Sequence, residues 1–546
     1  MKKLTDILNR FPKLAALIAG TLSAFGFAPF GVWPLIVLGL SALIYLTSKA
    51  KTAGTAALTG WLFGLGHFTI GNQWIAAAFH FQAEMPVWLG YFAVTALAAY
   101  LAVYPAITAA AAWKIGDTVR RSERPPTIAF ALSFAAMWTV TEWLRSLVFT
   151  GFAWNPVSAA MIDVPGIIAV RAIGTYGASG IIVLLSAIAL GLIGAVLTMQ
   201  WKAAFARLLD AALLAGFCAG LGTMAAGSVL PDKRQAITIV QPNISQAVKY
   251  DLNYDALNFV KLAVQSKPLP GQGPRLLLWP EAAIPDYLES GYPARFYQPQ
   301  PGGSAVGARM RLQSLLGKGD VLLTGATRLV IDKDGQLIAA RNSMLAMDAN
   351  GDLRGSYDKA HLVPYGEYLP MAPLLRFFGL NRLVPGDLDF WPGRGPATLN
   401  LGDGRAPESR AQVGFQICYE IIFSGRITDR THRPDFIFNA SNDAWFGTIG
   451  PPQHLAQARL RAIEEGLPII RATPTGISAI IDADGRILKS LPLGTAGRID
   501  STVPPTHTST WFAIWGNAAP LMFAVLLLAA GLLRPVFAVV TRRTSR

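Results

Sequence analysis

The sequence predicts a polytopic α-helical membrane protein with about eight spans and an additional α/β domain outside the lipid. Three observations indicate this class. The chain of 546 residues is 52% hydrophobic, which exceeds the usual content of soluble globular proteins. Apolar stretches of roughly the 20 residues that cross a bilayer recur through the first part of the chain and once near its end. Between them, short apolar runs such as residues 236–240, 276–279 and 413–417 alternate with helical patterns and with turn signals, among them Asn350-Gly351 and Asp484-Gly485, as in α/β domains.

We expect three regions along the chain. Residues 1–230 form a membrane domain with about seven transmembrane helices. Residues 231–510 form the α/β domain, and residues 511–546 form a last transmembrane helix with a basic tail. The candidate spans are residues 14–30, 32–46, 56–79, 87–113, 128–147, 167–199, 204–230 and 511–540. The ends of the first two stay open because these stretches are short and close together.

Lysine and arginine between the spans predict the orientation. They mark every second connection, and the alternate connections carry none. Because cytoplasmic loops are rich in these residues, both termini are expected in the cytoplasm and the α/β domain on the extracytoplasmic side. The marking residues are Lys2, Lys3, Arg10, Lys13, Lys49, Lys51, Lys114, Arg120, Arg121, Arg124, Lys202, Arg542, Arg543 and Arg546.

The net charge of +14 does not indicate nucleic-acid binding, because the basic residues are not gathered on one helix or stripe. The two cysteines, Cys218 and Cys418, lie in such different contexts that a disulfide between them is not expected. The histidines show no spacing typical of a metal site, and no cofactor is expected. They are His67, His80, His361, His432, His454 and His507.

Cys418 is the candidate nucleophile. It follows the apolar run 413–417, and the end of a buried strand holds a reactive side chain rigidly. A free cysteine is also often a small buried hydrophobe, so position alone does not decide its role. Two further segments favour chemistry: an apolar strand at residues 275–279 runs on to Glu281, and Lys359 lies in a turn-rich segment.

These three residues have the properties that acyl transfer requires. A thiol with a pKa of about 8.5 is mostly protonated at neutral pH, so a base that accepts its proton is useful. Glu281 can be that base, and we expect burial to raise its pKa towards neutrality. Lys359, kept cationic by a carboxylate neighbour, can stabilise the thiolate and then the oxyanion of a tetrahedral intermediate.

Three motifs, found in this order, resemble the signatures of the carbon-nitrogen hydrolase (nitrilase) superfamily. They are Trp279-Pro-Glu281, residues 357–370 and Ile417-Cys-Tyr-Glu420. With apolar spans on both sides, and with the segments 151–155 and 241–246, the chain resembles the apolipoprotein N-acyltransferase family within this superfamily. At Tyr250 it departs from that family, whose members often carry a tryptophan proposed to contact substrate.

The resemblance implies an αββα sandwich with Glu281 as general base, Lys359 as electrostatic stabiliser and Cys418 as nucleophile. It also implies supporting roles for Glu367, Tyr419 and Glu420, although a solvated loop or strand-end packing explains these residues as well.

The resemblance further implies a ping-pong reaction in the bacterial cytoplasmic (inner) membrane. A fatty acyl chain passes from a phospholipid to a Cys418 thioester, and then to the α-amine of the N-terminal diacylglyceryl-cysteine of a lipoprotein. The expected partners are therefore the phospholipid donor, diacylglyceryl-modified apolipoproteins and the bilayer, with no metal or nucleotide.

Two loops of the α/β domain are further candidates. In the first, Asn439 and Asn442 can donate to an oxyanion and Trp445 can line an acyl groove, although asparagines also close ordinary turns. The second, residues 370–380, is apolar and contains Phe377, Phe378 and Leu380. It is either a lid that faces lipid or a loop folded onto its own core.

Two charged residues, Glu142 and Arg145, lie within a candidate span, where charge is costly. We expect them to pair with each other, and contact with a lipid head group is the alternative.

Two other functions stay open. The first is a membrane-tethered carbon-nitrogen hydrolase, an amidase that acts on a soluble substrate; one span would suffice as its anchor, which argues against it. The second is a transporter or polytopic binding protein with an inactive α/β domain. It predicts unimpaired function after Cys418→Ala, and the sequence shows no pair of broken helices of the kind found at transport sites.

Overall fold

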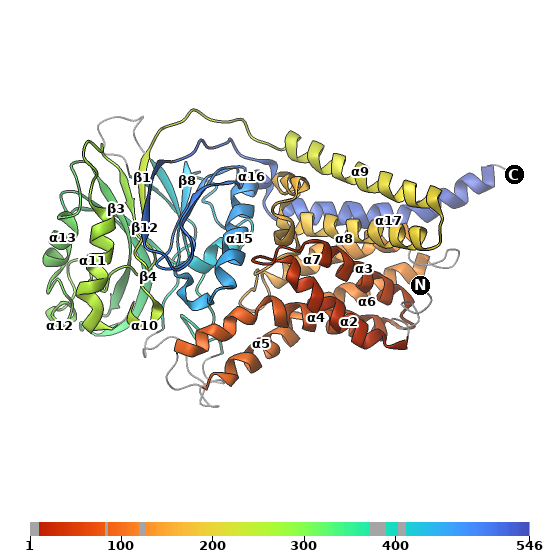
Figure 1. Cartoon of the computed structure of the whole chain (residues 1–546), viewed down its shortest axis with the longest axis horizontal. Helices are drawn as coiled ribbons and strands as arrows, with labels where there is room; N and C mark the ends of the chain where they lie inside the picture. Colours follow the sequence, from red (N-terminus) through yellow and green to blue (C-terminus); the bar gives the residue numbers. More distant parts are fainter. Residues whose placement is uncertain are drawn as a thin grey trace. The chain divides into compact units, whose positions relative to one another are not determined.

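The computed structural model of the chain describes residues 10–81, 86–119, 127–249, 251–371, 389–401 and 411–544. It divides into two compact units (Figure 1). The helical unit comprises Met1–Ala76, Val87–Ala226 and Ser509–Arg546, and the α/β unit comprises Ala77–Pro86 and Gly227–Thr508.

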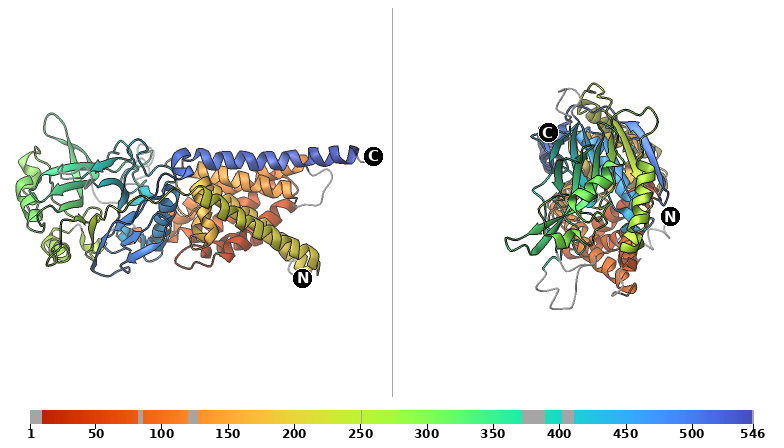
Figure 2. Two further views of the ribbon diagram at one scale, coloured as in Figure 1. Left: turned by 90° about the horizontal axis from the view of Figure 1, so that it is seen from above. Right: turned by 90° about the vertical axis from the view of Figure 1, so that its left-hand side faces the viewer.

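The helical unit has at least one helix in every stretch that we expected to span the membrane. The helices are α2 (Pro12–Ser23), α3 (Pro34–Lys49), α4 (Ala53–Gly71), α5 (Trp88–Leu101), α6 (Val103–Val119), α7 (Ile128–Arg145), α8 (Val170–Leu197), α9 (Trp201–Met224), α16 (Trp511–Trp515) and α17 (Ala518–Thr544). Figure 2 shows α17 running along other helices of this unit.

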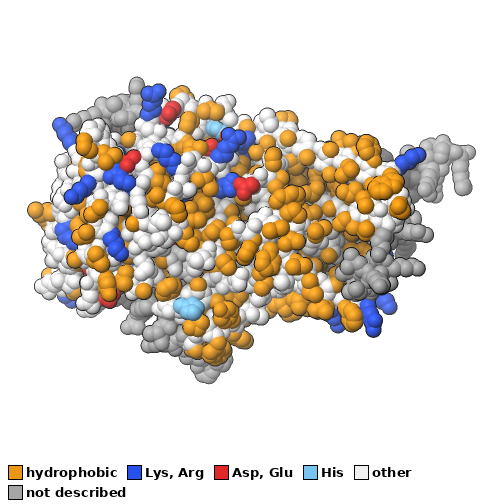
Figure 3. Space-filling model, viewed as in Figure 1, with side chains coloured by type: hydrophobic (Ala, Val, Ile, Leu, Met, Phe, Trp, Pro, Cys, Tyr) orange, Lys and Arg blue, Asp and Glu red, His pale blue; other side chains and the backbone are white. Residues whose placement is uncertain are grey.

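Three helical stretches among the described residues are long and apolar enough to cross a membrane: Trp88–Gly116, Pro165–Leu197 and Trp201–Met224. Shorter apolar helices are Pro12–Gly26, Pro34–Lys49 and Ala518–Leu533. On the side shown in Figure 3, hydrophobic side chains cover most of the helical unit, while lysines and arginines are scattered over the α/β unit. The total of about eight spans stays a prediction.

Close helix packing in this unit depends on glycine. A Cβ at Gly20 on α2 would overlap the backbone of α4, and a Cβ at Gly66 on α4 would overlap the backbone of α2. Small residues at such positions let helix backbones approach closely, which is typical of membrane helices.

The expectation that Glu142 and Arg145 pair with each other is confirmed. Both are buried, with Arg145 Nη2 3.9 Å from Glu142 Oε1. Arg145 also donates to the carbonyl oxygen of Trp154 at 2.8 Å, and Glu142 Oε1 accepts from the backbone N–H of Val157 at 2.9 Å. The pair therefore fixes the segment that follows α7.

The α/β unit contains two six-stranded sheets. In spatial order the first consists of β12 (Gly497–Thr502), β1 (Ala236–Gln241), β2 (Leu276–Leu278), β3 (Val321–Ile331), β4 (Leu337–Asp348) and β5 (Leu353–Asp358). The second consists of β11 (Ile487–Ser490), β10 (Ala479–Ile481), β9 (Ile469–Ala472), β8 (Phe436–Ala440), β7 (Gln412–Ile417) and β6 (Thr398–Asn400). Each sheet has three neighbouring parallel strands, β1 to β3 and β7 to β9, and antiparallel pairs outside them.

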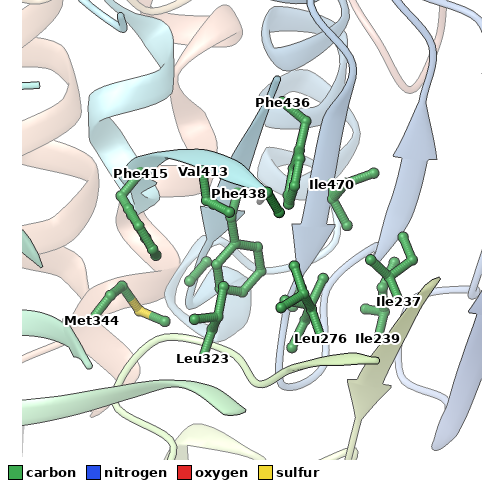
Figure 4. Packing of buried hydrophobic residues seen from close by; sticks show 14 of the residues in the cluster. Ile237, Ile239, Leu276, Leu323, Met344, Val413, Phe415, Phe436, Phe438 and Ile470 are labelled. Atoms are coloured by element: carbon green, nitrogen blue, oxygen red, sulfur yellow. The ribbon is translucent and has the colours of Figure 1, made fainter. Parts of the chain in front are cut away.

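Side-chain alternation along the strands builds the layers. Leu276 and Leu278 of β2 face the second sheet, where they join a core with Phe415 and Phe438 (Figure 4). Leu277 belongs to a separate core on the other face of its sheet, with side chains of α11 (Asp255–Ser266) and α13 (Ala305–Gln313). The buried helix α15 (Gly450–Glu465) packs against β9 of the second sheet. The predicted αββα sandwich is confirmed.

The two predicted turns, Asn350-Gly351 and Asp484-Gly485, do connect antiparallel strands, β4 with β5 and β10 with β11. The segment 370–380 lies almost wholly outside the described residues, and Phe377, Phe378 and Leu380 are among those not described. Its two alternatives, lid or packed loop, stay predictions.

Candidate active site

Three strand ends bring the predicted triad together. Glu281 lies three residues after β2, Lys359 directly follows β5, and Cys418 directly follows β7 as the first residue of the 3₁₀ helix η8 (Cys418–Ile422). The first two strands belong to one sheet and β7 to the other. All three side chains are buried within the α/β unit.

Lys359 lies between two carboxylates. Its Nζ is 3.4 Å from Glu281 Oε1 and 3.0 Å from Glu367 Oε2. The side-chain amide of Asn342 on β4 donates to both carboxylates, at 2.7 Å to Glu281 Oε1 and at 2.8 Å to Glu367 Oε1. Glu367, predicted as a supporting residue, thus shares the ammonium group of Lys359 with Glu281.

The Cys418 thiol acts on the Glu281 carboxylate and helps to lower its pKa. Burial and the negative charge of Glu281 raise the pKa of Cys418 well above its ordinary value, although Lys359 acts in the opposite direction. Burial alone would lower the pKa of Lys359, but the charges of Glu367, Glu281 and Cys418 raise it instead. The resting site therefore holds a neutral thiol beside a lysine cation.

The expected direction of the Glu281 pKa shift is wrong. Burial does act to raise this pKa, but Lys359, Lys249, Asn342 and the Cys418 thiol together outweigh it, so the pKa is lowered. Glu281 is therefore an ionised carboxylate that can accept the thiol proton, which is the protonation state that a general base requires.

The backbone is strained at Cys418 and next to Glu281, two of the three catalytic candidates. Cys418 has φ of 50° and Ala282, next to Glu281, has φ of 46°, a region that side chains other than glycine seldom adopt. The backbone around Glu281 also comes very close to Gly325 on β3, where a Cβ would overlap Pro280 to Ala282. Such strain persists only where the surroundings hold it, and it is common at functional sites.

Glu420 holds the turn that contains Cys418. Its Oε2 accepts from the N–H of Ile417 at 2.7 Å. Its Oε1 accepts from the N–H groups of Ala360 at 2.7 Å and His361 at 3.0 Å, and from the hydroxyl of Tyr357 at 2.9 Å. Burial raises the pKa of Glu420 to about 7, although these donors favour the ionised form. The carboxylate joins the Lys359 segment to the Cys418 segment.

Replacing Glu420 by glutamine is expected to lower the free energy of unfolding by about 1–3 kcal/mol, because the new NH₂ group cannot accept and leaves a buried donor unsatisfied. Thermal unfolding in detergent measures this. Glu289→Gln is the matched control, since that carboxylate is only partly buried and pairs with Arg328 at 2.8 Å. An unchanged unfolding temperature in Glu420→Gln would contradict the proposed holding role.

Tyr419 and Asn439 make contacts inside the fold. Tyr419 is buried, with its ring centroid 5.2 Å from that of Phe423 and 5.8 Å from that of His361. The side-chain amide of Asn439 donates to the carbonyl oxygen of Gln416 at 3.0 Å and so ties β8 to β7. Their direct roles towards substrate stay predictions.

Asn442 and Trp445 lie closer to the triad. The backbone of Asn442 acts to lower the pKa of the Cys418 thiol, against the effect of burial. With its side-chain oxygen turned towards donors, Asn442 accepts from Trp445 Nε1 and Lys249 Nζ, each at 3.2 Å. The Trp445 ring packs edge-on against Phe81, with centroids 5.7 Å apart. Tyr250, the departure from the family pattern, lies outside the described residues.

Lys249 and Asn342 belong to the site but were not predicted from the sequence. Lys249, in the short helix α10 (Gln246–Lys249), donates to the backbone oxygen of Glu281 at 2.9 Å, and burial lowers its pKa to about 8. Lys249 directly precedes Tyr250, the position where the chain departs from the family pattern, and this neighbourhood could have pointed to it. Asn342 lies within a long strand, and no local sequence pattern distinguishes it.

Among the residues that the structure describes, no three histidine, cysteine, aspartate or glutamate side chains are grouped so that they could hold a metal ion.

Two family models match the chain. Residues 19–188 match the model described as the apolipoprotein N-acyltransferase N-terminal domain, and residues 236–511 match the model described as carbon-nitrogen hydrolase. The second match covers the whole sandwich, including Glu281, Lys359 and Cys418.

Curated relatives extend over nearly the full chain. An apolipoprotein N-acyltransferase from Rhodopseudomonas palustris is 34% identical over 537 residues, covering 95% of this chain and 94% of the relative. One from Brucella melitensis is 35% identical over 536 residues, with coverages of 95% and 94%.

Among solved structures, an amidase of the nitrilase superfamily from Nesterenkonia matches with a TM-score of 0.32 and 16% identity, over 54% of this chain and 95% of the amidase. A carbon-nitrogen hydrolase from Helicobacter pylori matches with a TM-score of 0.32 and 15% identity, over 49% and 88%.

Proposed function

The chain belongs to the apolipoprotein N-acyltransferase family, and from this premise we propose that Cys418 carries the acyl group as a thioester between a phospholipid donor and a lipoprotein acceptor. The protein is thus an acyltransferase of the carbon-nitrogen hydrolase superfamily with lipoprotein substrates. We propose the phospholipid as the acyl donor, the roles of Cys418, Glu281 and Lys359, and the order of the two half-reactions.

In the first half-reaction, Glu281 accepts the thiol proton as the Cys418 sulfur attacks the carbonyl carbon of a phospholipid ester. The resulting oxyanion is stabilised by the ammonium group of Lys359. When the intermediate collapses, the bond between the acyl carbon and the glycerol oxygen breaks. Glu281 returns its proton to that oxygen, and a lysophospholipid leaves.

In the second half-reaction, the neutral α-amine of a diacylglyceryl-cysteine attacks the thioester. Glu281 now accepts a proton from the amine, a second oxyanion forms and collapses, and the sulfur leaves. The sulfur regains a proton from Glu281, so the site returns to its starting state with an amide bond made. The thioester requires protection from water, since hydrolysis would release a free fatty acid.

The observation that carries this proposal is the burial of Cys418, Glu281 and Lys359 at three strand ends of one unit, with Lys359 Nζ 3.4 Å from Glu281 Oε1. The Cys418 thiol is neutral before the reaction, and the ionised Glu281 carboxylate can accept its proton as the sulfur attacks.

We also propose that the α/β unit lies on the extracytoplasmic side of the bacterial cytoplasmic membrane, with both termini in the cytoplasm. The alternation of basic loops supports this orientation. Both proposed substrates are anchored in the bilayer, so an enzyme fixed in the same membrane confines and orients their encounter.

The membrane-tethered amidase is not favoured. Relatives named as acyltransferases align over almost the whole chain, and the helical half has its own acyltransferase family match. An amidase would need that half only as an anchor.

Mass spectrometry of the purified protein incubated with phospholipid tests the proposal. We expect a hydroxylamine-labile acyl group on Cys418 that a diacylated lipopeptide removes. Cys418→Ala should carry no adduct, while Cys218→Ala, which changes the other cysteine in α9, should be acylated like the wild type. Release of ammonia from simple amides without any adduct would instead support the amidase.

A further inference from the structure

A fully buried histidine lies directly behind the nucleophile. His454 on α15 has no exposed surface, and its Nε2 is 3.1 Å from the backbone carbonyl oxygen of Cys418. Because a carbonyl oxygen only accepts hydrogen bonds, the proton of this bond is on Nε2. His454 is therefore a donor to the peptide that follows the nucleophile.

Two buried charged residues hold the other side of the imidazole. Its Nδ1 is 3.0 Å from Asp443 Oδ1 and 3.0 Å from Arg471 Nη2. Arg471 Nη2 also contacts both carboxylate oxygens of Asp443, at 2.6 and 2.7 Å. Asp443 comes from the 3₁₀ helix η9 (Asp443–Phe446) and Arg471 from β9, so separate elements fix the ring orientation.

The cluster also reaches the neighbouring strand. Arg471 Nη1 donates to Ser441 Oγ at 3.1 Å and to Asn439 Oδ1. Removing so many polar and charged groups from water is costly, and such a network is retained only when its members satisfy one another. The cluster contacts the Cys418 peptide through the bond from His454 to the Cys418 carbonyl.

That contact acts on a strained residue. Cys418 has φ of 50°, so its backbone needs support to hold this conformation. The peptide group is planar, so fixing the Cys418 carbonyl also fixes the direction of the N–H of Tyr419 on the same plane. A sulfur atom and a backbone donor beside it are thus set in one orientation.

We propose that His454 is a positioning residue for the acyl-transfer reaction: anchored by Asp443 and Arg471, it holds the Cys418 peptide so that the thiol meets the ester in the reactive geometry. This inference rests on the proposed role of Cys418. His454 does not touch substrate, and it exchanges no proton with the thiol.

The test compares His454→Leu, which removes the donor, with His454→Gln, whose side-chain NH₂ can reach the same carbonyl. We expect the leucine variant to form acyl-enzyme about a hundredfold more slowly, the loss that a misplaced reacting atom causes, with an unchanged KM for phospholipid. The glutamine variant should recover most of that rate. If His454 had a purely structural role, the leucine and glutamine variants would have the same kcat whenever their unfolding temperatures are equal.

Cys418→Ala is measured in parallel. If it still forms acyl-enzyme or product, the proposed function and this inference both fail. If it is inactive while His454→Leu has the wild-type rate, or while the leucine and glutamine variants are equally slow, the inference alone is overturned. Should His454→Leu not fold, Asp443→Asn replaces it: a slower kcat with unchanged KM supports the positioning role, and a wild-type kcat overturns it.

Discussion

Replacing Glu281 by glutamine is expected to slow formation of the Cys418 acyl-enzyme by about 10²- to 10⁴-fold, the usual contribution of a general base. The thiol pKa is raised, so without a base the sulfur stays protonated and is a poor nucleophile. The amide oxygen of glutamine can still accept from Asn342, which is 2.7 Å from Glu281 Oε1. The fold should therefore survive the change.

Rapid-quench measurement of lysophospholipid release in a single turnover reports this rate directly. Glu289→Gln is again the matched control, because it makes the same chemical change at a carboxylate that pairs with Arg328 outside the triad. Acyl-enzyme formation at the wild-type rate in Glu281→Gln would show that another group accepts the thiol proton.

Replacing Lys359 by methionine is expected both to remove oxyanion stabilisation, worth about 10²- to 10³-fold in rate, and to destabilise the fold by about 3–5 kcal/mol. The lysine is the cation between two buried carboxylates, at 3.4 Å from Glu281 and 3.0 Å from Glu367. Asn342 bonds to both carboxylates but carries no charge. Without Lys359 the two negative charges face each other with Lys249 as the remaining nearby cation.

The pH dependence of stability should therefore reverse in this variant. In the wild type the folded pKa of Glu281 lies below its ordinary 4.5, so the stability it contributes is present above pH 4.5 and is lost as pH falls through the folded pKa. In Lys359→Met we expect burial to raise the folded pKa of Glu281. Stability is then retained below pH 4.5 and lost as pH rises through the raised value.

Thermal unfolding in detergent between pH 4.5 and pH 8 measures this reversal. Lys233→Met is the matched control, since Lys233 also makes an ion pair, 2.7 Å from Asp435, but its side chain is 51% exposed. Parallel pH profiles for Lys359→Met and the wild type would contradict the electrostatic role.

The triad could be predicted because Glu281 and Cys418 each follow an apolar run at a strand end, and Lys359 lies in a turn-rich segment that resembles a family motif. The pKa of Glu281 could not, because burial is readable from the sequence whereas the opposing contacts of Lys249 and Asn342 require the fold. His454 was noted only for its lack of metal-site spacing. Its bond to Cys418 joins residues far apart in the chain.

The strands, too, were predictable only where a local sequence pattern marks them. Apolar β1, β2 and β7 and the two hairpin turns were predicted from local pattern. The edge strand β12, with the polar sequence Gly-Arg-Ile-Asp-Ser-Thr, carries no such signal and is a strand because it pairs with β1. The short strand β9 contains Arg471, a buried charged residue that pairs with the buried Asp443.

The α/β unit is discontinuous in the sequence, and this bears on how the protein is made. Its segment Ala77–Pro86 is synthesised long before Gly227–Thr508, with helices of the other unit in between. The ring of Phe81 can therefore pack against the ring of Trp445 only after Trp445 has been synthesised. A fragment that begins after the helical half would lack this early segment, and with it the ring that packs against Trp445.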